Sequence, residues 1–138
     1  MTGIDHVGLS VADLEGMTDW YRRALDLDVR QTGEIPGTGI RMVLLADAGG
    51  TWAIELLHRP GSTRAPRIAD PDEALLAQGY GHLCLRVADI DAAHRDLVAA
   101  GAASLVIPRD ARRPGARLAY VADPEGNLIE LIDRGIPA

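Results

Sequence analysis

The chain has 138 residues, with 14 Lys+Arg against 20 Asp+Glu and therefore a formal net charge of −6. This length suits one compact domain, and the acidic balance argues against binding to nucleic acid or to anionic membranes. No apolar run approaches the ~20 residues that a membrane-spanning helix needs, and the first residues carry no signal-peptide pattern. The single cysteine, Cys84, excludes an internal disulfide. We therefore expect a globular cytoplasmic domain.

Three sequence segments occur twice, in the same order and at nearly constant spacing. HVGLSVADL from His6 returns as HLCLRVADI from His82, and RMVLLAD from Arg41 returns as RLAYVAD from Arg117. The third segment, IELL from Ile54, returns as IELI near the C-terminus. Such a repeat indicates two copies of one supersecondary unit.

The first copy begins with a strand in which apolar and polar residues alternate. A helix follows, because Asp13 is a suitable N-cap and the apolar residues after it recur at helical spacing. Three further strands complete the copy, with a Gly-rich loop after the first of them. The predicted ranges are 4–11 for the first strand, 29–32, 40–46 and 51–57 for the later strands, and 32–39 for the loop.

A connector and a short helix link the two copies. Residues 58–69 contain two prolines and a glycine, which is typical of a surface link. After the connector, Asp70 is a suitable N-cap and Pro71 takes the first helical position. Glu73 completes a capping box, and Gly79 ends the predicted helix.

The second copy repeats the order of the first. Asp89 is the predicted N-cap of its helix, and Gly101 ends that helix. The predicted strands are 81–87, 105–108, 117–122 and 128–133, with a loop over 109–115. We therefore expect an α+β fold in which tandem βαβββ modules form a cupped mixed sheet with helices on its outer face. The predicted organisation is one domain over 1–138, with modules 1–57 and 80–138 joined by 58–79.

The alternation of side chains along the strands points to a metal site. In the first strand of each copy a histidine lies opposite the aliphatic residues, and in the last strand a glutamate does. A carboxylate between Ile and Leu is costly to bury unless its charge is compensated. Two imidazoles and two carboxylates suit one divalent ion of Ni, Co, Zn, Mn or Fe and leave positions for water or substrate. The predicted metal ligands are His6, Glu55, His82 and Glu130.

Motifs along nearly the whole chain resemble those of one known family. They are IDHVGLSVADL from Ile4, the pair Trp20-Tyr21, the pair Gly81-His82, and DPEGNLIEL from Asp123. Together they resemble the vicinal oxygen chelate superfamily, which contains glyoxalase I, methylmalonyl-CoA epimerase, extradiol dioxygenases, fosfomycin-resistance enzymes and bleomycin-binding proteins. The resemblance implies paired βαβββ modules, commonly completed in a homodimer around each metal, and it is specific for the fold rather than for the reaction.

The resemblance also implies a reaction class. A full His-Glu-His-Glu set is similar to that of bacterial glyoxalase I, in which nickel or cobalt is the usual metal. Ser10 and Arg59 stand where that enzyme usually has an Arg that binds glutathione and an Asn. We therefore expect a metal-dependent isomerase or lyase of glyoxalase type, acting by proton transfer on a small molecule with vicinal oxygens other than a glutathione adduct. Glu130 is the expected catalytic base, with Glu55 acting on the opposite face.

Three alternatives stay open at this point. A non-haem iron dioxygenase would use His6, His82 and Glu130 as a facial triad. An epimerase would use the same proton-transfer groups for a 1,1-transfer. A protein that sequesters an antibiotic would bind its ligand without metal. Oxygen uptake and the effect of metal chelation distinguish these classes.

Several further residues are candidates for substrate contacts. Two arginines at equivalent strand positions can hold an anion by bidentate hydrogen bonds. Two small residues share a strand face with the candidate histidines, and a tryptophan comes shortly before Glu55. These predicted contacts are Arg41, Arg117, Ser10, Cys84 and Trp52. The remaining histidines, His58 and His94, are interpreted as surface residues.

Overall fold

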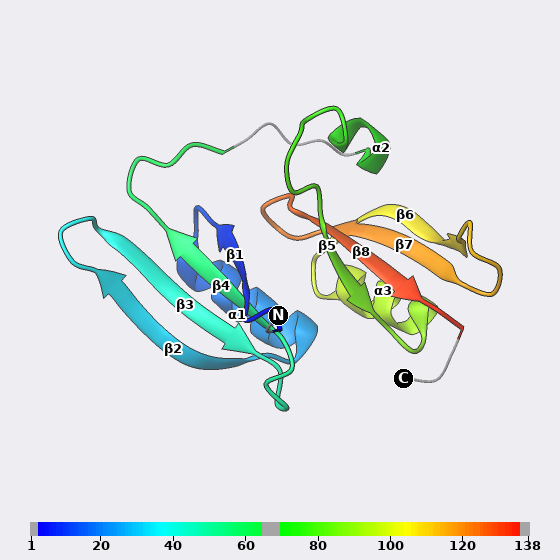
Figure 1. Ribbon diagram of the computed structural model, residues 1–138, viewed down its shortest axis with the longest axis horizontal. Helices are drawn as coiled ribbons and strands as arrows, with labels where there is room; N and C mark the ends of the chain where they lie inside the picture. The colour runs from blue at the N-terminus through cyan, green and yellow to red at the C-terminus, as the bar shows by residue number, and fades with distance from the viewer. Residues whose placement is uncertain (1–2, 65–69, 136–138) are drawn as a thin grey trace. The chain divides into compact units, whose positions relative to one another are not determined.

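The computed structural model describes residues 3–64 and 70–135, and the chain divides into two compact units between residues 65 and 66. Each unit consists of a four-stranded mixed sheet and a longer helix that lies against one face of that sheet (Figure 1). The predicted α+β class with two βαβββ modules is confirmed. No helix in the described ranges is long and apolar enough to cross a membrane.

Unit 1 has the strand order β1-β4-β3-β2, with β1 parallel to β4 and the other neighbours antiparallel. Its elements are β1 (Val7–Ser10), α1 (Leu14–Leu25), β2 (Asp28–Ile35), β3 (Ile40–Ala46) and β4 (Ala53–His58).

Unit 2 repeats this topology with the order β5-β8-β7-β6, and β5 is parallel to β8. Its elements are α2 (Pro71–Ala74), β5 (Leu83–Arg86), α3 (Ile90–Ala99), β6 (Ala103–Asp110), β7 (Arg117–Ala122) and β8 (Leu128–Asp133).

The predicted helix N-caps are confirmed. Asp13 accepts a hydrogen bond from the Gly16 N–H at 2.9 Å, and Asp89 accepts one from the Ala92 N–H at 3.0 Å. Each cap satisfies a backbone donor that the first helical turn leaves without a partner.

Asp70 caps α2 in the same way, but the prediction that this helix continues to Gly79 is wrong. The helix ends at Ala74, and Leu75 and Leu76 after it are 67% and 85% exposed. A helix continued through these residues would bury no apolar stripe, so packing does not extend it.

Each sheet has one buried face and one accessible face. Leu45 and Leu56 of unit 1 are fully buried on the side covered by α1, as are Val121 and Leu131 of unit 2 on the side covered by α3. Burying a side chain of this kind contributes about 1.5–3 kcal/mol. The core therefore lies between helix and sheet in each unit, and the opposite face of each sheet is free to carry polar groups.

The structure corrects several predicted strand boundaries. The first strand begins at Val7 rather than at residue 4, because its parallel partner β4 pairs with it only from Ile54 onward. The predicted loop over 32–39 is wrong in its first half, since β2 pairs with β3 as far as Ile35. Likewise β6 continues to Asp110, two residues beyond its predicted end.

Corresponding aspartates hold the turns that lead into the two Glu-bearing strands. In unit 1, Asp47 accepts hydrogen bonds from the Thr51 and Trp52 N–H groups at 2.7 and 3.1 Å. In unit 2, the buried Asp123 accepts from the Glu125 and Asn127 N–H groups at 2.9 and 2.8 Å. These bonds satisfy turn donors and define where β4 and β8 begin.

Candidate metal and substrate site

Each unit places one histidine beside one glutamate on the accessible face of its sheet. In unit 1, Nε2 of His6 lies 3.5 Å from Oε2 of Glu55. In unit 2, Nε2 of His82 lies 2.9 Å from Oε2 of Glu130. The glutamate side chains are 21% and 16% exposed, so both carboxylates are largely withdrawn from solvent.

The strand register explains why these side chains meet. Glu55 pairs with Gly8 of β1, and Glu130 pairs with Cys84 of β5. The histidine comes two residues before the partner in each case, and alternate residues of an extended chain share a face. Both pairs therefore follow from one strand pairing that the repeat uses twice.

The spacing of the donor atoms fits a divalent metal ion. Imidazole nitrogen and carboxylate oxygen bind such ions at about 2.1 Å, so two adjacent ligands lie about 3.0–3.4 Å apart. The observed separations of 2.9 and 3.5 Å agree with this value. Among the described residues, no group of three or more His, Cys, Asp or Glu side chains lies close enough to hold an ion. Each pair by itself supplies two donors, which is half of the predicted set.

Asp5 orients the imidazole of His6. Oδ2 of Asp5 lies 2.7 Å from Nδ1 of His6, and this hydrogen bond is the main cause that raises the pKa of His6. With its proton on Nδ1, the ring donates to Asp5 and directs the lone pair of Nε2 toward Glu55. A carboxylate behind the second ring nitrogen is the usual arrangement for a metal-binding histidine.

Cys84 and Tyr120 flank Glu130 on the neighbouring strands. Burial, and then the negative charge of Glu130, raise the pKa of the Cys84 thiol to about 11 and that of the Tyr120 hydroxyl to about 12. Both groups therefore carry their protons at neutral pH. The Tyr120 ring also meets the His82 ring edge to face, with centroids 5.5 Å apart.

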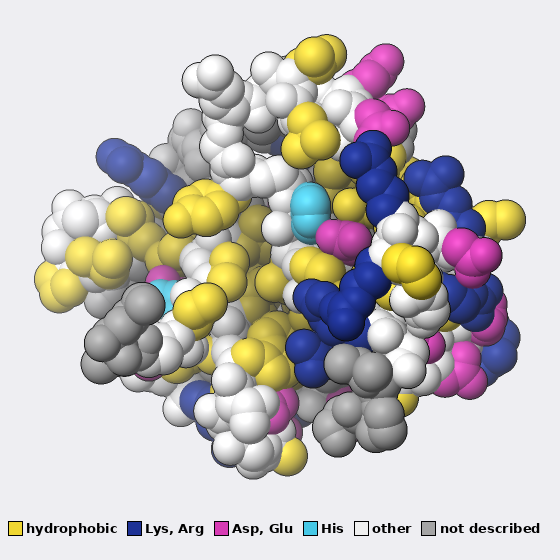
Figure 2. Space-filling view, turned by 45° about the vertical axis from the view of Figure 1, so that its right-hand side comes forward, with side chains coloured by type: hydrophobic (Ala, Val, Ile, Leu, Met, Phe, Trp, Pro, Cys, Tyr) yellow, Lys and Arg dark blue, Asp and Glu magenta, His cyan; other side chains and the backbone are white. Residues whose placement is uncertain are grey.

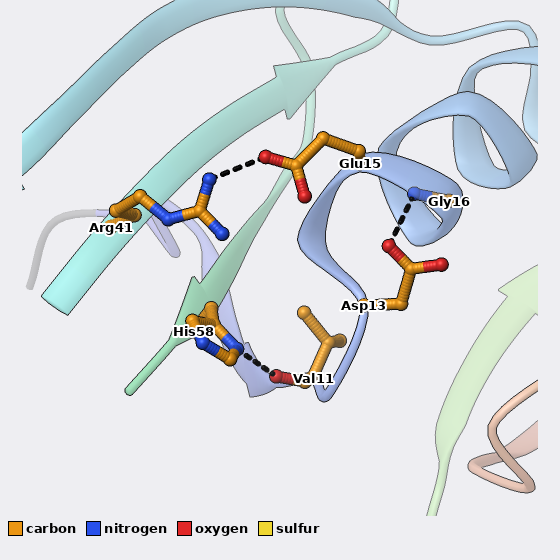
Figure 3. A network of polar contacts seen from close by, with 6 residues as sticks. All are labelled: Val11, Asp13, Glu15, Gly16, Arg41 and His58. Carbon is orange, nitrogen blue, oxygen red and sulfur yellow. Dashed lines mark hydrogen bonds and ion pairs between the residues drawn. The ribbon is translucent and has the colours of Figure 1, made fainter. Parts of the chain in front are cut away.

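Arg41 and Arg117, two of the predicted substrate contacts, lie on the helix side of their sheets. Arg41 pairs with Glu15 in the first turn of α1 (Figure 3), and Arg117 pairs with Asp91 in the first turn of α3 at 2.5 and 3.1 Å. These arginines lower the pKa of their partner carboxyls. The structure therefore does not bring either arginine together with the glutamate of its own unit.

The remaining predicted contacts have different environments. Ser10 is exposed in β1 and pairs with Leu57, on the same face as Glu55. Cys84 is exposed and lies beside Glu130. Trp52 is half-buried in the turn before β4, where its N–H donates to Asp47.

The two other histidines make local contacts outside the His–Glu pairs. Nδ1 of His58 lies 3.3 Å from the Val11 carbonyl oxygen. Figure 3 draws this contact as a dashed line. Nε2 of His94, on α3, lies 2.9 Å from Oγ of Ser104. Both histidines are half-buried.

Sequence reasoning missed Asp5 and Tyr120. Asp5 precedes the expected ligand His6 directly, and a carboxylate next to a candidate metal histidine is a usable signal. Tyr120 holds the repeat position that Leu44 holds in unit 1, and both pair with the glutamate of their unit. Comparing the two copies position by position would have shown this polar replacement.

Comparisons with known proteins agree with this geometry. The family model described as Glyoxalase/Bleomycin resistance protein/Dioxygenase superfamily matches residues 3–131. The lactoylglutathione lyase of Pseudomonas putida is 27% identical over 93% of this chain and 83% of its own length. The ethylmalonyl-CoA/methylmalonyl-CoA epimerase of Cereibacter sphaeroides is 34% identical over 72% of this chain and 71% of its own. The mitochondrial methylmalonyl-CoA epimerase of Homo sapiens is 34% identical over 68% of this chain, which spans 51% of that relative.

A solved structure shows the same fold. The glyoxalase family protein from Bacillus cereus superposes with a TM-score of 0.79 over 96% of this chain and 94% of its own, at 21% identity. At this level of identity the likeness concerns the fold alone.

Proposed function

The chain belongs to the Glyoxalase/Bleomycin resistance protein/Dioxygenase superfamily, and we propose that it is a divalent-metal-dependent isomerase or lyase acting by proton transfer on a small molecule with vicinal oxygens. The observation that carries this proposal is the His–Glu pair on the accessible sheet face of each unit, at 3.5 and 2.9 Å. A relative named lactoylglutathione lyase, similar over 93% of this chain, supports the reaction class.

The residues that would hold the metal are His6, Glu55, His82 and Glu130. Two imidazoles and two carboxylates are a donor set for Ni, Co, Zn, Mn or Fe. A bound divalent ion supplies Lewis-acid stabilisation of negative charge that develops on the substrate oxygens. In the tautomer with its proton on Nδ1, the first imidazole would donate to Asp5 and leave Nε2 available.

Glu130 is the proposed base. Its carboxylate is 16% exposed and lies between a thiol and a phenol that both keep their protons at neutral pH. It would take a proton from the substrate carbon and return it to a neighbouring atom, with Glu55 serving the opposite face of the substrate. Low solvent access keeps the transferred proton from exchanging freely with water.

The proposed substrate is a small molecule with vicinal oxygens that is not a glutathione derivative. Ser10 lies at an exposed position of β1 on the face of Glu55, and Arg59 follows β4. Neither position has the residue that the glutathione-using pattern has there. We also predict that the protein forms a homodimer, which sedimentation analysis can test. A cytoplasmic location is likewise a prediction.

Substitution of Glu130 tests the proposal. Glu130→Asp keeps a carboxylate but withdraws it by one methylene, and we expect an activity loss of about 10²–10⁴-fold even when the assay contains saturating divalent metal. The assay uses thiol adducts of 2-oxoaldehydes under anaerobic conditions, with metal content measured by elemental analysis. Glu34→Gln, at an exposed position of β2, is the matched control and keeps full activity. Full turnover by Glu130→Asp, or purification of an active protein without metal, would contradict the proposal.

Epimerisation is a second candidate, favoured by the 34% identity to the Cereibacter sphaeroides epimerase. The same two carboxylates can remove a proton from one face of a carbon and return it to the other. Turnover of methylmalonyl-CoA without turnover of the thiol adducts would decide for an epimerase. Oxygen consumption with a catechol and ferrous iron would instead indicate a dioxygenase.

A further inference from the structure

Beside the row of residues that contains Glu130, the accessible face of unit 2 carries a second row with an arginine at each end. Arg86 pairs with Ile132, Ile132 pairs with Leu118, and Leu118 pairs with Arg109. Each of Arg86, Ile132 and Leu118 is two residues along its strand from the row of Cys84, Glu130 and Tyr120. Two residues of a strand span about 7 Å, so the second row lies about that far from the carboxylate.

A third arginine joins one end of this row. Arg134 follows β8 at the alternate position after Ile132, on the side of the sheet where Glu130 lies. Its positive charge acts on the thiol of Cys84 and opposes the rise in pKa of that thiol, which agrees with this placement. Arg86 on β5 and Arg134 directly after β8 are therefore at diagonal positions, from which long side chains can reach each other.

These two arginines have no acidic partner among the described residues. Within the ranges 3–64 and 70–135, neither makes an ion pair or a side-chain hydrogen bond, whereas Arg41, Arg95 and Arg117 each pair with a carboxylate. Two like charges at diagonal positions repel each other unless an anion lies between them. Figure 2 shows a face on which a histidine lies beside an acidic side chain and arginine side chains gather close to them.

The repeat supplies an internal comparison. The corresponding row of unit 1 pairs Ser10 with Leu57, Leu57 with Met42, and Met42 with Gly33. It carries no charge, although unit 1 keeps the His–Glu pair. The arginine at position 86 therefore distinguishes unit 2 from its own repeat at a position where the strand geometry is the same.

The opposite end of the arginine row is less suited to an anion. Arg109 borders a surface depression of about 390 Å³ that Leu105, Val106 and Tyr120 also line. Asp70, the N-cap of α2, and Asp72 in α2 line the same depression, and their negative charges offset the positive charge of Arg109. The positive end of this face is therefore the one with Arg86 and Arg134.

We propose that Arg86 and Arg134 bind a carboxylate or phosphate group of the substrate, at a place on the sheet between about 7 Å (Arg86) and about 13 Å (Arg134) from the row of Glu130, the proposed base. The two guanidinium groups would hold this group by charge-assisted hydrogen bonds, with the half-buried Ile132 beneath the apolar part of the substrate. The substrate class is an organic anion in which an apolar stretch separates the reacting carbon from the anionic group. The assignment of the bound anion as substrate rests on the proposed function.

Titration of the full chain with two probes tests the proposal. Butyrate and inorganic phosphate are added separately to metal-free protein, and binding is followed by isotope-edited NMR at the backbone amides of β5 and β8. We expect saturable shifts there with at least one probe, and about tenfold weaker binding in Arg86→Gln and in Arg134→Gln. Arg86→Lys keeps the charge without the planar fork and should lose part of the affinity. Arg95→Gln removes one positive charge from α3 and serves as the matched control, with binding unchanged.

The outcomes separate the two proposals. If only butyrate binds and the binding depends on Arg86, the ligand is a carboxylate. If only phosphate binds in this way, the ligand is a phosphate group. Either result supports the proposed anion site. Three results would overturn the proposed anion site. Arg86→Gln could bind the probe as tightly as the unsubstituted protein, Arg95→Gln could lose as much affinity as Arg86→Gln, or neither probe could bind. Because the protein in this titration carries no metal, a failure of the proposed metal chemistry leaves the result of the anion test intact.

Discussion

Tyr120 and Glu130 lie directly opposite each other on β7 and β8, and the charge of Glu130 helps to keep the Tyr120 hydroxyl protonated. The tyrosine ring also packs edge to face against His82, the residue whose Nε2 faces Glu130. One side chain therefore contacts both members of the His–Glu pair of unit 2. This arrangement makes Tyr120 a positioning residue for the carboxylate.

Removing the hydroxyl of Tyr120 should lower turnover without weakening substrate binding. Tyr120→Phe keeps the ring contact with His82 and loses only the interaction with Glu130, which for a hydrogen bond to a charged group is about 1.5 kcal/mol. We expect kcat to fall about tenfold, with KM changed less than about twofold, in steady-state kinetics. Tyr80→Phe is the control, because the Tyr80 side chain is fully exposed. An unchanged kcat would contradict a positioning role for Tyr120. So would a loss of kcat/KM that comes entirely from a rise in KM.

Loss of one imidazole should weaken metal binding. We expect His82→Gln to reduce the affinity for Ni²⁺ or Co²⁺ more than about tenfold, measured by isothermal titration calorimetry, because one donor of the set is lost. His94→Gln removes a histidine that faces Ser104 instead and should bind metal as the unsubstituted protein does. If the two His–Glu pairs share one ion, the titration ends at one ion per chain. Equal affinities of the two variants would exclude His82 as a ligand.

Truncation of a core leucine should destabilise the protein strongly. Leu131 is fully buried in β8, so Leu131→Ala should lower the free energy of unfolding by about 2–5 kcal/mol through lost burial and a residual cavity. Ile107→Ala, in which the removed side chain is 71% exposed, should change it by less than about 0.5 kcal/mol. Urea unfolding of both variants measures the difference. Equal effects would mean that Leu131 is not part of the core.

The turn before β4 should make stability depend on pH in the acid range. Hydrogen bonds from the Trp52 and Thr51 backbone, together with the Thr51 hydroxyl, hold the pKa of Asp47 below its ordinary value of 3.8. The contribution of the Asp47 carboxylate to the free energy of unfolding is therefore present above pH 3.8. It is lost as the pH falls through the lower pKa that Asp47 has in the folded state. Asp47→Ala should destabilise the protein near neutral pH, and the difference should shrink on acidification.

Denaturant unfolding between neutral pH and about pH 3 measures this effect. Asp19→Ala, on α1, is the control, because the Asp19 side chain has no hydrogen-bond partner in the part of the chain that the structure describes. A difference between Asp47→Ala and the unsubstituted protein that stays constant over this range would contradict the assigned hydrogen bonds.

The repeated elements could be predicted because their signals are local. The ranges predicted for β3 and β7, residues 40–46 and 117–122, are the observed ones, since each is an almost continuous apolar run that ends directly before an aspartate. Asp13 and Asp89 likewise lie directly before the helices that they cap. The predicted end of β2 was wrong because its last residues are held by pairing with β3, a partner that local pattern does not reveal.

The sequence by itself determined which residues could serve as ligands, because the order His–Glu recurs in both copies and strand alternation sets their faces. Only the tertiary structure decided which charged neighbours they have. Arg117 looked like a substrate contact by its repeat position, yet it pairs with Asp91 of a helix 26 residues earlier in the chain. Sequence reasoning assigned Arg86 no role. The pairing of β5 with β8, however, places it diagonally to Arg134, which follows β8. Side-chain partners across strands and helices depend on long-range register and packing, which no short stretch of sequence contains.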